Sequence, residues 1–450
     1  MKIRTPPSTT SFSWSQLAKE TPELMDTYME WSTPIDPKGR YLHYDELKYR
    51  VPSPLKPEIV WSIVKQARNK QRVPIIALGE PPVQCHAVLT PRIQKALSET
   101  DRNTTAAALA VIADKVGERV RLDYLVQDLI EDESISSSQL EGAATTTRIA
   151  KNMLRRRRKP RTLDEKMILG NFKMMLHAWK RRTQPLDLDL IQELHQVGVE
   201  GINDDHYQPG VFRHTNDVVV EDSEGHVVHA PPPAENLASR LQAIVDWVNT
   251  DHDSGANLFI HPLIKAIVLH FAIGYEHPFR DGNGRVARAL FYWYMYRNEF
   301  EAFRYISISA LLKERATQYG KSYLYTETDE MDLTYFIEYQ CKVVVEAIGA
   351  VQSAWLRAAE EAEKFNRWLW DSGLYQQLNE KQKIVFQVAK SDIVQAFTIR
   401  NVEHNLGCSY NTAAAVLNGL VSLKLFRKRK EGRQWVYTMA DKSDLIKNWE

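Results

Sequence analysis

The sequence predicts a mainly α-helical protein, and three observations lead to that prediction. Helical patterns of apolar residues begin near Pro57 and recur along most of the chain. The stretch 262–273 is apolar nearly all round, which is typical of a buried central helix. Strand signals are confined to 210–233 and to the segment after Phe426. We therefore expect a helical bundle with one β-hairpin and a small C-terminal module.

The composition bounds the class of protein. A chain of 450 residues with 44% apolar content suits two or three ordinary domains. Its net charge of +1 gives no reason to expect nucleic-acid binding by the chain as a whole. The three cysteines form no metal pattern and suit a reducing cytoplasm. Since the sequence shows neither a signal peptide nor an uncharged run of transmembrane length, we expect a cytoplasmic protein with no membrane contact.

The helical elements follow one another in a simple order. Residues 1–55 are rich in Pro, Ser and Tyr, and predict an arm lying over the domain. Helical patterns follow at Thr105–Leu129, Lys166–Lys180, Leu186–Gly198 and Val343–Leu369. The basic run from Arg155 to Lys159 suggests an anion or nucleic-acid patch, although Pro160 and the acidic residues after it favour a solvated helix end.

The stretch 277–288 carries most of the functional information. It reads His-Pro-Phe-Arg-Asp-Gly-Asn-Gly-Arg-Val-Ala-Arg. Pro262 suits the first turn of the preceding helix, Gly274 and Pro278 are expected to end it, and a second helix is expected from about Gly284. The loop therefore precedes a helix N-terminus, where unpaired N–H groups and the helix dipole favour anions.

The side chains of this loop suit a triphosphate with a metal ion. Gly282 and Gly284 let the backbone turn sharply and approach phosphate closely. Arg285 and Arg288 share one helical face and present planar forks of donors. Asp281 offers a hard oxygen ligand that suits Mg²⁺.

His277 is the one group of this loop that can accept a proton near neutral pH, and Phe279 is expected to anchor the loop in the core. Other interpretations of these segments fit less well. A dinucleotide fingerprint requires a preceding strand, and here a helix precedes. Gly320-Lys321-Ser322 is not the end of a P-loop, because Arg315 stands where the first glycine belongs. An ordinary helix–turn–helix corner would not require so complete a pattern.

At every fixed position, the stretch resembles the signature of the Fic family, His-x-Phe-x-(Asp/Glu)-Gly-Asn-Gly-Arg-x-x-Arg. The resemblance implies an enzyme that moves AMP from ATP to a Ser, Thr or Tyr hydroxyl of a target protein and releases pyrophosphate. His277 would act as the general base. Asp281 would hold Mg²⁺ between the α- and β-phosphates, and Asn283 would bind the α-phosphate.

The same resemblance implies roles for the remaining residues of the motif. Gly282 and Gly284 would line the anion hole. Arg285 and Arg288 would bind the β- and γ-phosphates.

A second match lies upstream, at Ser137-Ser138-Gln139-Leu140-Glu141-Gly142. It resembles the family's inhibitory motif, (Ser/Thr)-x-x-x-Glu-(Gly/Asn). A helix from about Asp123 would end at Gly142, a C-terminal stop, with Glu141 in its last turn. The resemblance implies that Glu141 pairs with Arg288 and occupies the γ-phosphate site. A solvated helix end is the alternative, and in some family members the same glutamate supports removal of AMP.

The segment 210–233 predicts an element that docks a target protein. Val218–Val220 and His226–Val228 flank an acidic turn that ends in Gly225, which is a β-hairpin pattern. The segment resembles the family's flap, which pairs with the target by strand addition. A plain surface hairpin is the alternative. The nearby histidines have no zinc-site spacing and are expected at the surface: His206, His214, His226 and His229.

From about residue 376 the sequence predicts a winged helix-turn-helix. The expected elements are three helices and two strands, at Asn379–Lys390, Ile399–Asn405, Ser409–Leu423, Phe426–Lys430 and Gln434–Thr438. Ser409 to Thr412 would open a recognition helix, and Arg427 to Arg433 would form a basic wing suited to phosphate contacts. Dimerisation or protein docking would explain the module equally well.

These inferences divide the chain into four parts: an N-terminal arm and helical extension (1–110), a catalytic domain with its inhibitory helix (111–345), a connecting helix (346–375) and the winged helix (376–450). The expected function is that of a protein adenylyltransferase that acts on a target protein, with the protein itself as one candidate target, and that is restrained by pairing of Glu141 with Arg288. The alternatives are transfer of UMP, phosphate or phosphocholine, removal of AMP, and DNA-binding regulation. The oligomeric state, homo-oligomers included, is left open.

Overall fold

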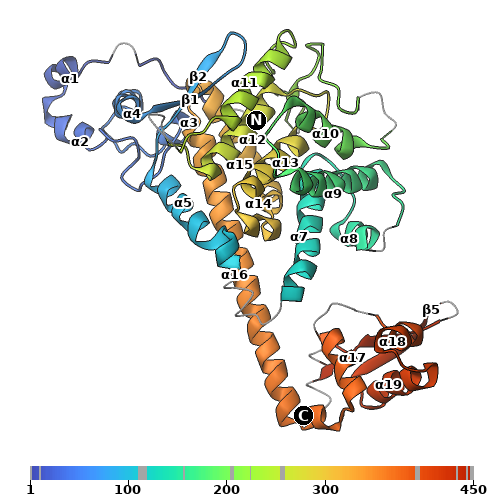
Figure 1. Cartoon of the computed structure of the whole chain (residues 1–450). Coiled ribbons are helices and arrows are strands. Elements are labelled where there is room, and N and C mark those ends of the chain that lie inside the picture. Colours follow the sequence, from blue (N-terminus) through green and yellow to red (C-terminus); the bar gives the residue numbers. More distant parts are fainter. Residues whose placement is uncertain are drawn as a thin grey trace. The chain divides into compact units, whose positions relative to one another are not determined.

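The computed structural model describes residues 3–9, 12–109, 119–155, 158–202, 207–222, 224–253, 259–390, 396–431, 434–441 and 444–445. Within these ranges the protein is mostly helical, and its strands form three antiparallel pairs (Figure 1). The expected mainly α fold is therefore confirmed. None of the helices in these ranges is long and apolar enough to cross a bilayer.

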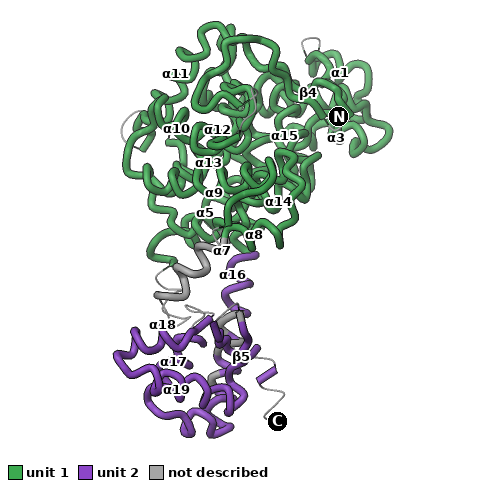
Figure 2. The backbone as a smooth tube through the Cα atoms, turned by 90° about the vertical axis from the view of Figure 1, so that its right-hand side faces the viewer, with its two compact units in different colours: residues 1–109, 129–349 green, residues 110–128, 350–450 purple. Residues whose placement is uncertain are grey.

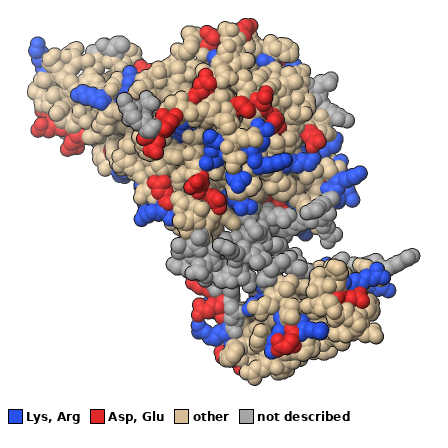
Figure 3. Space-filling view, in the orientation of Figure 1, with Lys and Arg blue, Asp and Glu red and all other residues tan. Residues whose placement is uncertain are grey.

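The chain folds into two compact units, which Figure 2 distinguishes by colour. Unit 1 consists of Met1–Leu109 and Leu129–Gly349, and unit 2 of Ala110–Asp128 and Ala350–Glu450. Two helices contribute to both units, namely α7 (Arg119–Leu140) and α16 (Thr334–Asp371). Figure 3 shows both basic and acidic side chains on the visible face of unit 1.

The first part of unit 1 has a core of its own. Its elements are α1 (Trp14–Glu20), η1 (Pro22–Leu24), α2 (Met25–Met29), α3 (Tyr44–Leu47), α4 (Pro57–Gln71), β1 (Val73–Leu78), β2 (Val83–Ala87) and α5 (Pro91–Thr104). Trp31, Trp61 and Tyr28 lie buried in this core with aliphatic side chains. Tyr28 and Trp31 pack here against Trp61 of α4, a contact that the weak apolar period of 1–55 does not predict. The arm expected over 1–55 stays a prediction. The β1–β2 hairpin was not predicted.

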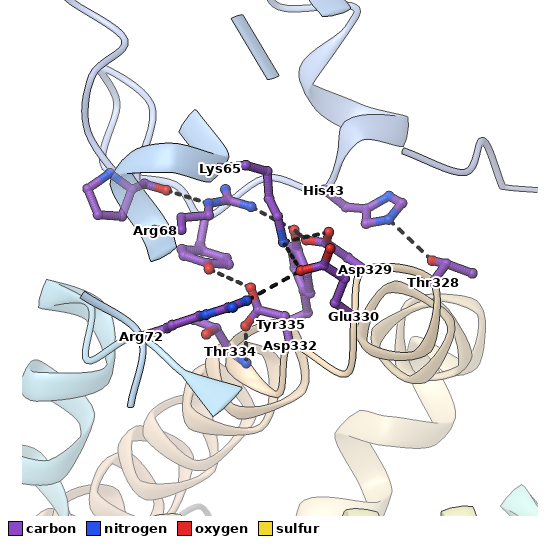
Figure 4. A network of polar contacts seen from close by, with 12 residues as sticks. His43, Lys65, Arg68, Arg72, Thr328, Asp329, Glu330, Asp332, Thr334 and Tyr335 are labelled. Carbon is purple, nitrogen blue, oxygen red and sulfur yellow. Dashed lines mark hydrogen bonds and ion pairs between the residues drawn. The ribbon is translucent and has the colours of Figure 1, made fainter. Parts of the chain in front are cut away.

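A buried polar network joins this first part to the corner between α15 (Ala316–Thr328) and α16 (Figure 4). Lys65 of α4 forms an ion pair with Asp329 at 2.8 Å, and both side chains are almost fully buried. Arg68, one turn further along α4, donates to the Tyr335 hydroxyl at 2.7 Å. Tyr335 in turn donates to Asp329 at 2.8 Å. Because buried charges are tolerated only when they are paired, these contacts fix where the corner lies.

The rest of unit 1 surrounds a central pair of helices. Its elements are the C-terminal part of α7, then α8 (Thr147–Arg155), α9 (Leu163–Arg181), α10 (Leu188–Val199), β3 (Val220–Glu221), β4 (Val227–His229), α11 (Leu237–Asn249), α12 (Pro262–Glu276), α13 (Asn283–Arg297), η2 (Glu301–Tyr305), α14 (Ile308–Glu314), α15 and the first part of α16. Helix α12 packs against α13, and α13 also packs against α9 and α10. Nearly every residue of α12 and α13 is buried, as their sequences predict.

Helix α12 differs from the prediction at its C-terminal end. It continues past Gly274 to Glu276. A Cβ atom at Gly274 would lie 2.5 Å from the hydroxyl oxygen of Tyr323 on α15. The glycine therefore permits close helix packing, whereas the sequence analysis had assigned it to the end of the helix.

Unit 2 has a separate hydrophobic core. Its described elements are the C-terminal part of α16, η3 (Leu374–Gln377), α17 (Glu380–Lys390), α18 (Ile399–Leu406), α19 (Tyr410–Ser422), β5 (Phe426–Glu431) and β6 (Gln434–Met439). The core includes Phe365 and Leu369 of α16, so this helix is an integral part of the unit. The order of α17 to β6 is the order expected of a winged helix-turn-helix.

Candidate active site

His277 stands at the turn that ends α12. Its backbone is left-handed, with φ 48° and ψ 60°, and its N–H donates to the carbonyl of Ile273 at 3.0 Å. Its Nδ1 lies 3.1 Å from the carbonyl oxygen of Gly274. Since a carbonyl can only accept, Nδ1 carries the proton and Nε2 is the acceptor. Burial lowers the pKa of His277 to about 4, so the ring is neutral at pH 7.

Arg213 holds this turn in place, and the sequence analysis did not single it out. Its main-chain N–H donates to the carbonyl of Pro278, and its Nε donates to the carbonyl of His277, both at 2.8 Å. Its Nη2 donates to the carbonyls of Glu276 and Pro232. The left-handed turn is thereby held by a side chain that is far away in sequence. No local sequence pattern predicts such a contact.

The glycine loop is braced from within. Gly282, with φ 82°, is the N-cap of α13. The side-chain amide of Asn283 accepts from the N–H of Phe279 and donates to its carbonyl, both at 2.8 Å. Phe279 is fully buried and anchors the loop as expected. Because both ends of the Asn283 amide are used in this bracing, its expected contact with the α-phosphate stays a prediction.

His195 of α10 supports the loop from the other side, and the sequence analysis missed it as well. Its ring stacks on Phe279 with the ring centroids 3.8 Å apart. Nδ1 accepts from the N–H of Gly210, and Nε2 donates to the carbonyl of Asp281, both at 3.0 Å. This pattern requires a neutral ring, in agreement with burial lowering the pKa of His195 to about 4. A lone histidine on an apolar helix face gives no local signal of such a role.

The two motif arginines are buried and only partly paired. Arg285 and Arg288 are each 1% exposed. Among the described residues, Nε and Nη2 of Arg285 and Nη1 of Arg288 have no hydrogen-bond partner. Buried donors without partners are rare and costly, and such donors on two neighbouring arginines suit an anion. The Asp281 carboxylate is 41% exposed and lies 3.9 Å from Arg285.

Glu141 occupies part of this anion site. Its Oε1 lies 2.8 Å from Nη2 of Arg288. Nε of Arg288 donates to the Ser137 hydroxyl at 2.8 Å, and Nη2 also donates to the Ser137 carbonyl. Burial alone would raise the pKa of Glu141, but the Arg288 guanidinium outweighs burial and lowers it. The expected ion pair is therefore present.

The end of helix α7 differs slightly from the prediction. The helix ends at Leu140, and Glu141 follows it directly. Gly142 continues the turn with φ 99°. A Cβ atom at Gly284 would lie 2.2 Å from Oε1 of Glu141, so the carboxylate rests on the N-terminal turn of α13 where only a glycine leaves room.

Glu133 fixes α7 to its neighbours. This buried carboxylate accepts from the Tyr292 hydroxyl at 3.0 Å, from the Ser307 hydroxyl at 2.9 Å, and from the N–H and hydroxyl of Ser309. Tyr292 belongs to α13 and Ser309 to α14. The helix that carries Glu141 is thus tied by a buried polar group to the helix that carries Arg288.

The segment 210–233 includes the expected hairpin, with β3 pairing antiparallel to β4. The side chains of Val211, Val219 and Val227 are exposed in this segment. One expectation about its histidines was wrong. His229 is buried and bonded on both ring nitrogens, whereas His206 lies outside the described residues.

Comparison with known proteins identifies part of the chain. Residues 185–295 match the model of the Fic/DOC family. The chain is 35% identical over 133 residues to "Protein adenylyltransferase Fic" of Drosophila virilis, which covers 29% of this chain and 25% of that protein. The protein of the same name from Drosophila willistoni is 34% identical over 133 residues, 29% of this chain and 24% of its own length. The chain thus spans about a quarter of these relatives.

A solved structure of a Fic family protein from Desulfovibrio desulfuricans G20 is also similar. It has 17% sequence identity and a TM-score of 0.48, and the match covers 78% of this chain and 96% of the other. The family match at 185–295 extends from the residues before α10 to near the end of α13, and so contains the loop, both arginines and the supporting His195 and Arg213. The segment 185–295 is therefore similar to the Fic/DOC family, whereas Ser137 and Glu141 lie before the matched residues.

Proposed function

We propose that this protein is a protein adenylyltransferase, which moves AMP from ATP to a Ser, Thr or Tyr hydroxyl of a target protein. One observation carries the proposal. A neutral imidazole, a glycine turn at a helix N-terminus and two buried arginines with unpartnered donors meet in one site. The first can take a proton from a hydroxyl, and the others can hold a polyphosphate.

The chemistry follows from this arrangement. The target hydroxyl oxygen forms a bond to the α-phosphorus of ATP, and the bond from that phosphorus to the bridging oxygen breaks, which releases pyrophosphate. Nε2 of His277 accepts the hydroxyl proton, because its Nδ1 proton is held by Gly274. Arg285 and Arg288 neutralise charge on the β- and γ-phosphates. Positioning and charge neutralisation supply most of the rate enhancement in such a reaction.

The site also fits the Mg²⁺ that the family resemblance implies. Asp281 provides one partly exposed carboxylate beside the phosphate-binding arginines, and Mg²⁺ in such sites commonly uses one or two carboxylates together with substrate phosphates. When bound, the ion would neutralise charge on the phosphates. Asp281 is the residue we expect to hold it.

We further propose that the Glu141–Arg288 pair restrains the enzyme. ATP needs the Arg288 donors for its γ-phosphate, and Glu141 occupies one of them. Removing the carboxylate should therefore raise transfer on the order of 10- to 100-fold, the range of typical coupling between two sites. Removal of AMP is the alternative activity for the same residue.

The hairpin is the docking element in this proposal. Its exposed valines and short, solvated strands suit the addition of an extended target segment as a further strand. The hairpin is also tied to the active site, since His195 links Gly210 to Asp281.

Mass spectrometry of Glu141→Gly incubated with ATP and Mg²⁺ tests the function. We expect added AMP on the protein itself or on an added acceptor protein, and none when His277→Ala is also present. Parallel incubations with UTP, GTP and CDP-choline separate the rival transferred groups. An adduct that persists in the His277→Ala variant, or an adduct other than AMP, would contradict the proposal.

A second function is favoured by the charge pattern of unit 2, and we propose that it binds duplex DNA. Four consecutive cations of β5, Arg427 to Lys430, are exposed. Helix α19 contains no charged residue, and Tyr410, Asn411 and Asn418 are exposed on it. A helix without carboxylates next to a basic strand suits a major groove with phosphates alongside.

A mobility-shift assay on the full chain tests DNA binding. The double variant Lys428→Glu and Lys430→Glu should lose binding, and the dependence of affinity on salt should become shallower. Lys381→Glu, an equally exposed change on α17, is the matched control and should lose much less. Equal binding by the double variant and the parent would exclude this surface.

A further inference from the structure

His229 is a buried histidine whose two ring nitrogens both face acceptors. It lies at the end of β4, the second strand of the docking hairpin, and its side chain is 9% exposed. Its Nδ1 lies 2.8 Å from Oε2 of Glu327 on α15. Its Nε2 lies 2.8 Å from the carbonyl oxygen of Tyr275 on α12. One side chain thereby joins the hairpin to two helices of the active site.

These two contacts decide the charge of the ring. A carbonyl oxygen can only accept, so Nε2 must carry a proton. A carboxylate also accepts, so Nδ1 must carry one as well. Only the imidazolium ion satisfies both contacts while Glu327 is ionised. By contrast, His195 of α10 accepts a hydrogen bond from Gly210, at the other end of the segment 210–233, and is therefore neutral.

The surroundings support this charge. Burial alone would lower the pKa of His229, but the hydrogen bond and charge of Glu327 outweigh burial and raise it, with smaller contributions from Tyr275 and Glu276. Glu276 is itself paired with Arg240 at 2.9 Å. The other titratable ring that senses His229 is His277, whose pKa the positive charge of His229 helps to lower.

We propose that protonated His229 is a positioning residue that clamps the target-docking strand to the catalytic end of α12. Tyr275, whose carbonyl it holds, lies two residues before His277 in the chain. The clamp therefore sets the target-binding strand against the turn that carries the base. This inference rests on the proposed function for its meaning, but the charge and the clamp are testable without any transferase activity.

The clamp makes the hairpin sensitive to alkaline pH. A histidine whose folded pKa is raised stabilises its contacts fully below the ordinary pKa, and that stabilisation is lost as pH rises through the folded pKa. Loss of the Nδ1 proton would leave a ring lone pair facing the Glu327 carboxylate. We therefore expect the hairpin to be held at neutral pH and loosened as pH rises above the raised pKa.

Nitrogen NMR of the full-length protein with ¹⁵N-labelled histidine tests the charge, with His229 assigned by the His229→Gln variant. We expect protons on both ring nitrogens at pH 7, and a lower pKa in Glu327→Gln, where the countercharge is absent. A neutral His229 ring at pH 7 would overturn the proposal, whether or not the protein transfers AMP.

Amide hydrogen exchange tests the clamp in the same protein. After correction for intrinsic rates, exchange in β3 and β4 should be several-fold faster in His229→Gln than in the parent at pH 7. In the parent, exchange in these strands should become faster as pH rises. In Glu327→Gln, the same acceleration should begin at a lower pH. His226→Gln, an exposed change in the same hairpin, is the control and should match the parent. Unchanged exchange in His229→Gln would also overturn the proposal.

Kinetics test the link to function if Glu141→Gly transfers AMP to a second copy of the protein. The acceptor in this assay is the inactive His277→Ala variant, and the KM values of enzymes with and without His229→Gln are compared. Adding His229→Gln should raise the KM for the acceptor several-fold and leave the KM for ATP unchanged. An equal rise in both would show that His229 acts on the fold as a whole, which would contradict a positioning role.

Discussion

At the scale of single residues, the site depends on a glycine as well as on its charged side chains. Gly284 leaves the space in which the Glu141 carboxylate rests, only 2.2 Å from where a Cβ atom would be. In the proposed function, a phosphate group of ATP uses the same space. We therefore expect the glycine to be needed both for the contact of Glu141 and for nucleotide binding.

We predict that Gly284→Ala displaces Glu141 and still fails to activate the enzyme. The added methyl group clashes with the carboxylate and equally with an incoming phosphate, so ATP binding should fall at least about tenfold, or roughly 1.4 kcal/mol. Calorimetric ATP titration in the Glu141→Gly background measures this. Gly349→Ala is the control, because a Cβ atom there meets nothing within 4 Å. ATP binding equal to that of the Glu141→Gly parent would refute the prediction.

The depressed pKa of His277 predicts the acid limit of activity. The base must be neutral, and its pKa of about 4 lies below the ordinary value of 6.5. Transfer by Glu141→Gly should therefore persist as pH falls from 7 to 5 and decline only at about pH 4 or below, because this variant lacks the Glu141 charge that raises the pKa of His277. Stability should fall over the same range, because the unfolded histidine takes up a proton that the folded one does not. Initial rates from brief assays measure this, and a decline centred near pH 6.5 would contradict it.

Residue roles could be predicted from the sequence only where they are local. The loop residues and Glu141 stand in short patterns, so their grouping could be anticipated. His195 and Arg213 act on the main chain of residues far away in sequence, and no spacing encodes such contacts. Asn283 was found by its pattern, yet its bracing of Phe279 depends on the folded turn.

At the scale of elements, Glu133 anchors α7, the helix that Glu141 directly follows. Glu133 accepts hydrogen bonds from Tyr292 of α13, from Ser307 just before α14, and from the hydroxyl and main-chain N–H of Ser309 in α14. A buried acceptor of this kind contributes more to stability than an exposed one. If it is removed, its donors lose their partner and stay out of contact with water.

We predict that Glu133→Ala destabilises the protein by about 2–4 kcal/mol and partly relieves the restraint. The Ser309 N–H and the hydroxyls of Ser307 and Ser309 lose their acceptor, whereas Tyr292 keeps the carbonyl of Ile306, and α7 is held less firmly. Chemical denaturation measures the first effect and AMP transfer the second. Asp132→Ala, a neighbouring change whose carboxylate is about one-third exposed, is the control. Full stability with unchanged restraint would contradict the prediction.

The elements themselves were predictable to different degrees. Helices α12 and α13 are so evenly apolar that their existence and burial follow from sequence alone. The end of α12 was misjudged because Gly274 serves packing against Tyr323. The β1–β2 hairpin contains prolines at its turn and within a strand, which weaken the strand pattern, so its pairing emerges only in the folded chain.

At the scale of the whole molecule, unit 1 is held together by charges buried between its first and last segments. Lys65 and Asp329 lie more than two hundred residues apart in sequence, and each is about 5% exposed or less. Their pairing fixes the start of α16, and with it the position of α15 beside the active site.

We predict that Lys65→Met lowers the stability of unit 1 by about 3–5 kcal/mol, because it leaves Asp329 buried without its cation. The double variant Lys65→Met with Asp329→Asn should recover part of this loss, since the unpaired charge is gone. Thermal and denaturant unfolding of the parent, Lys65→Met, Asp329→Asn and the double variant measure the coupling. Additive effects of the two changes would show that the pair contributes nothing beyond its separate members.

The sharing of α7 between two units has a consequence for the order of events on the ribosome. Unit 2 needs residues from before 128 and from after 350, whereas every residue of unit 1 has been made by 349. At about 5–20 residues per second, roughly 10–40 seconds pass before synthesis of the second piece of unit 2 begins. The contacts of Glu133, Ser137 and Glu141 all lie within unit 1, so we expect the Glu141–Arg288 pair to form before unit 2 is complete.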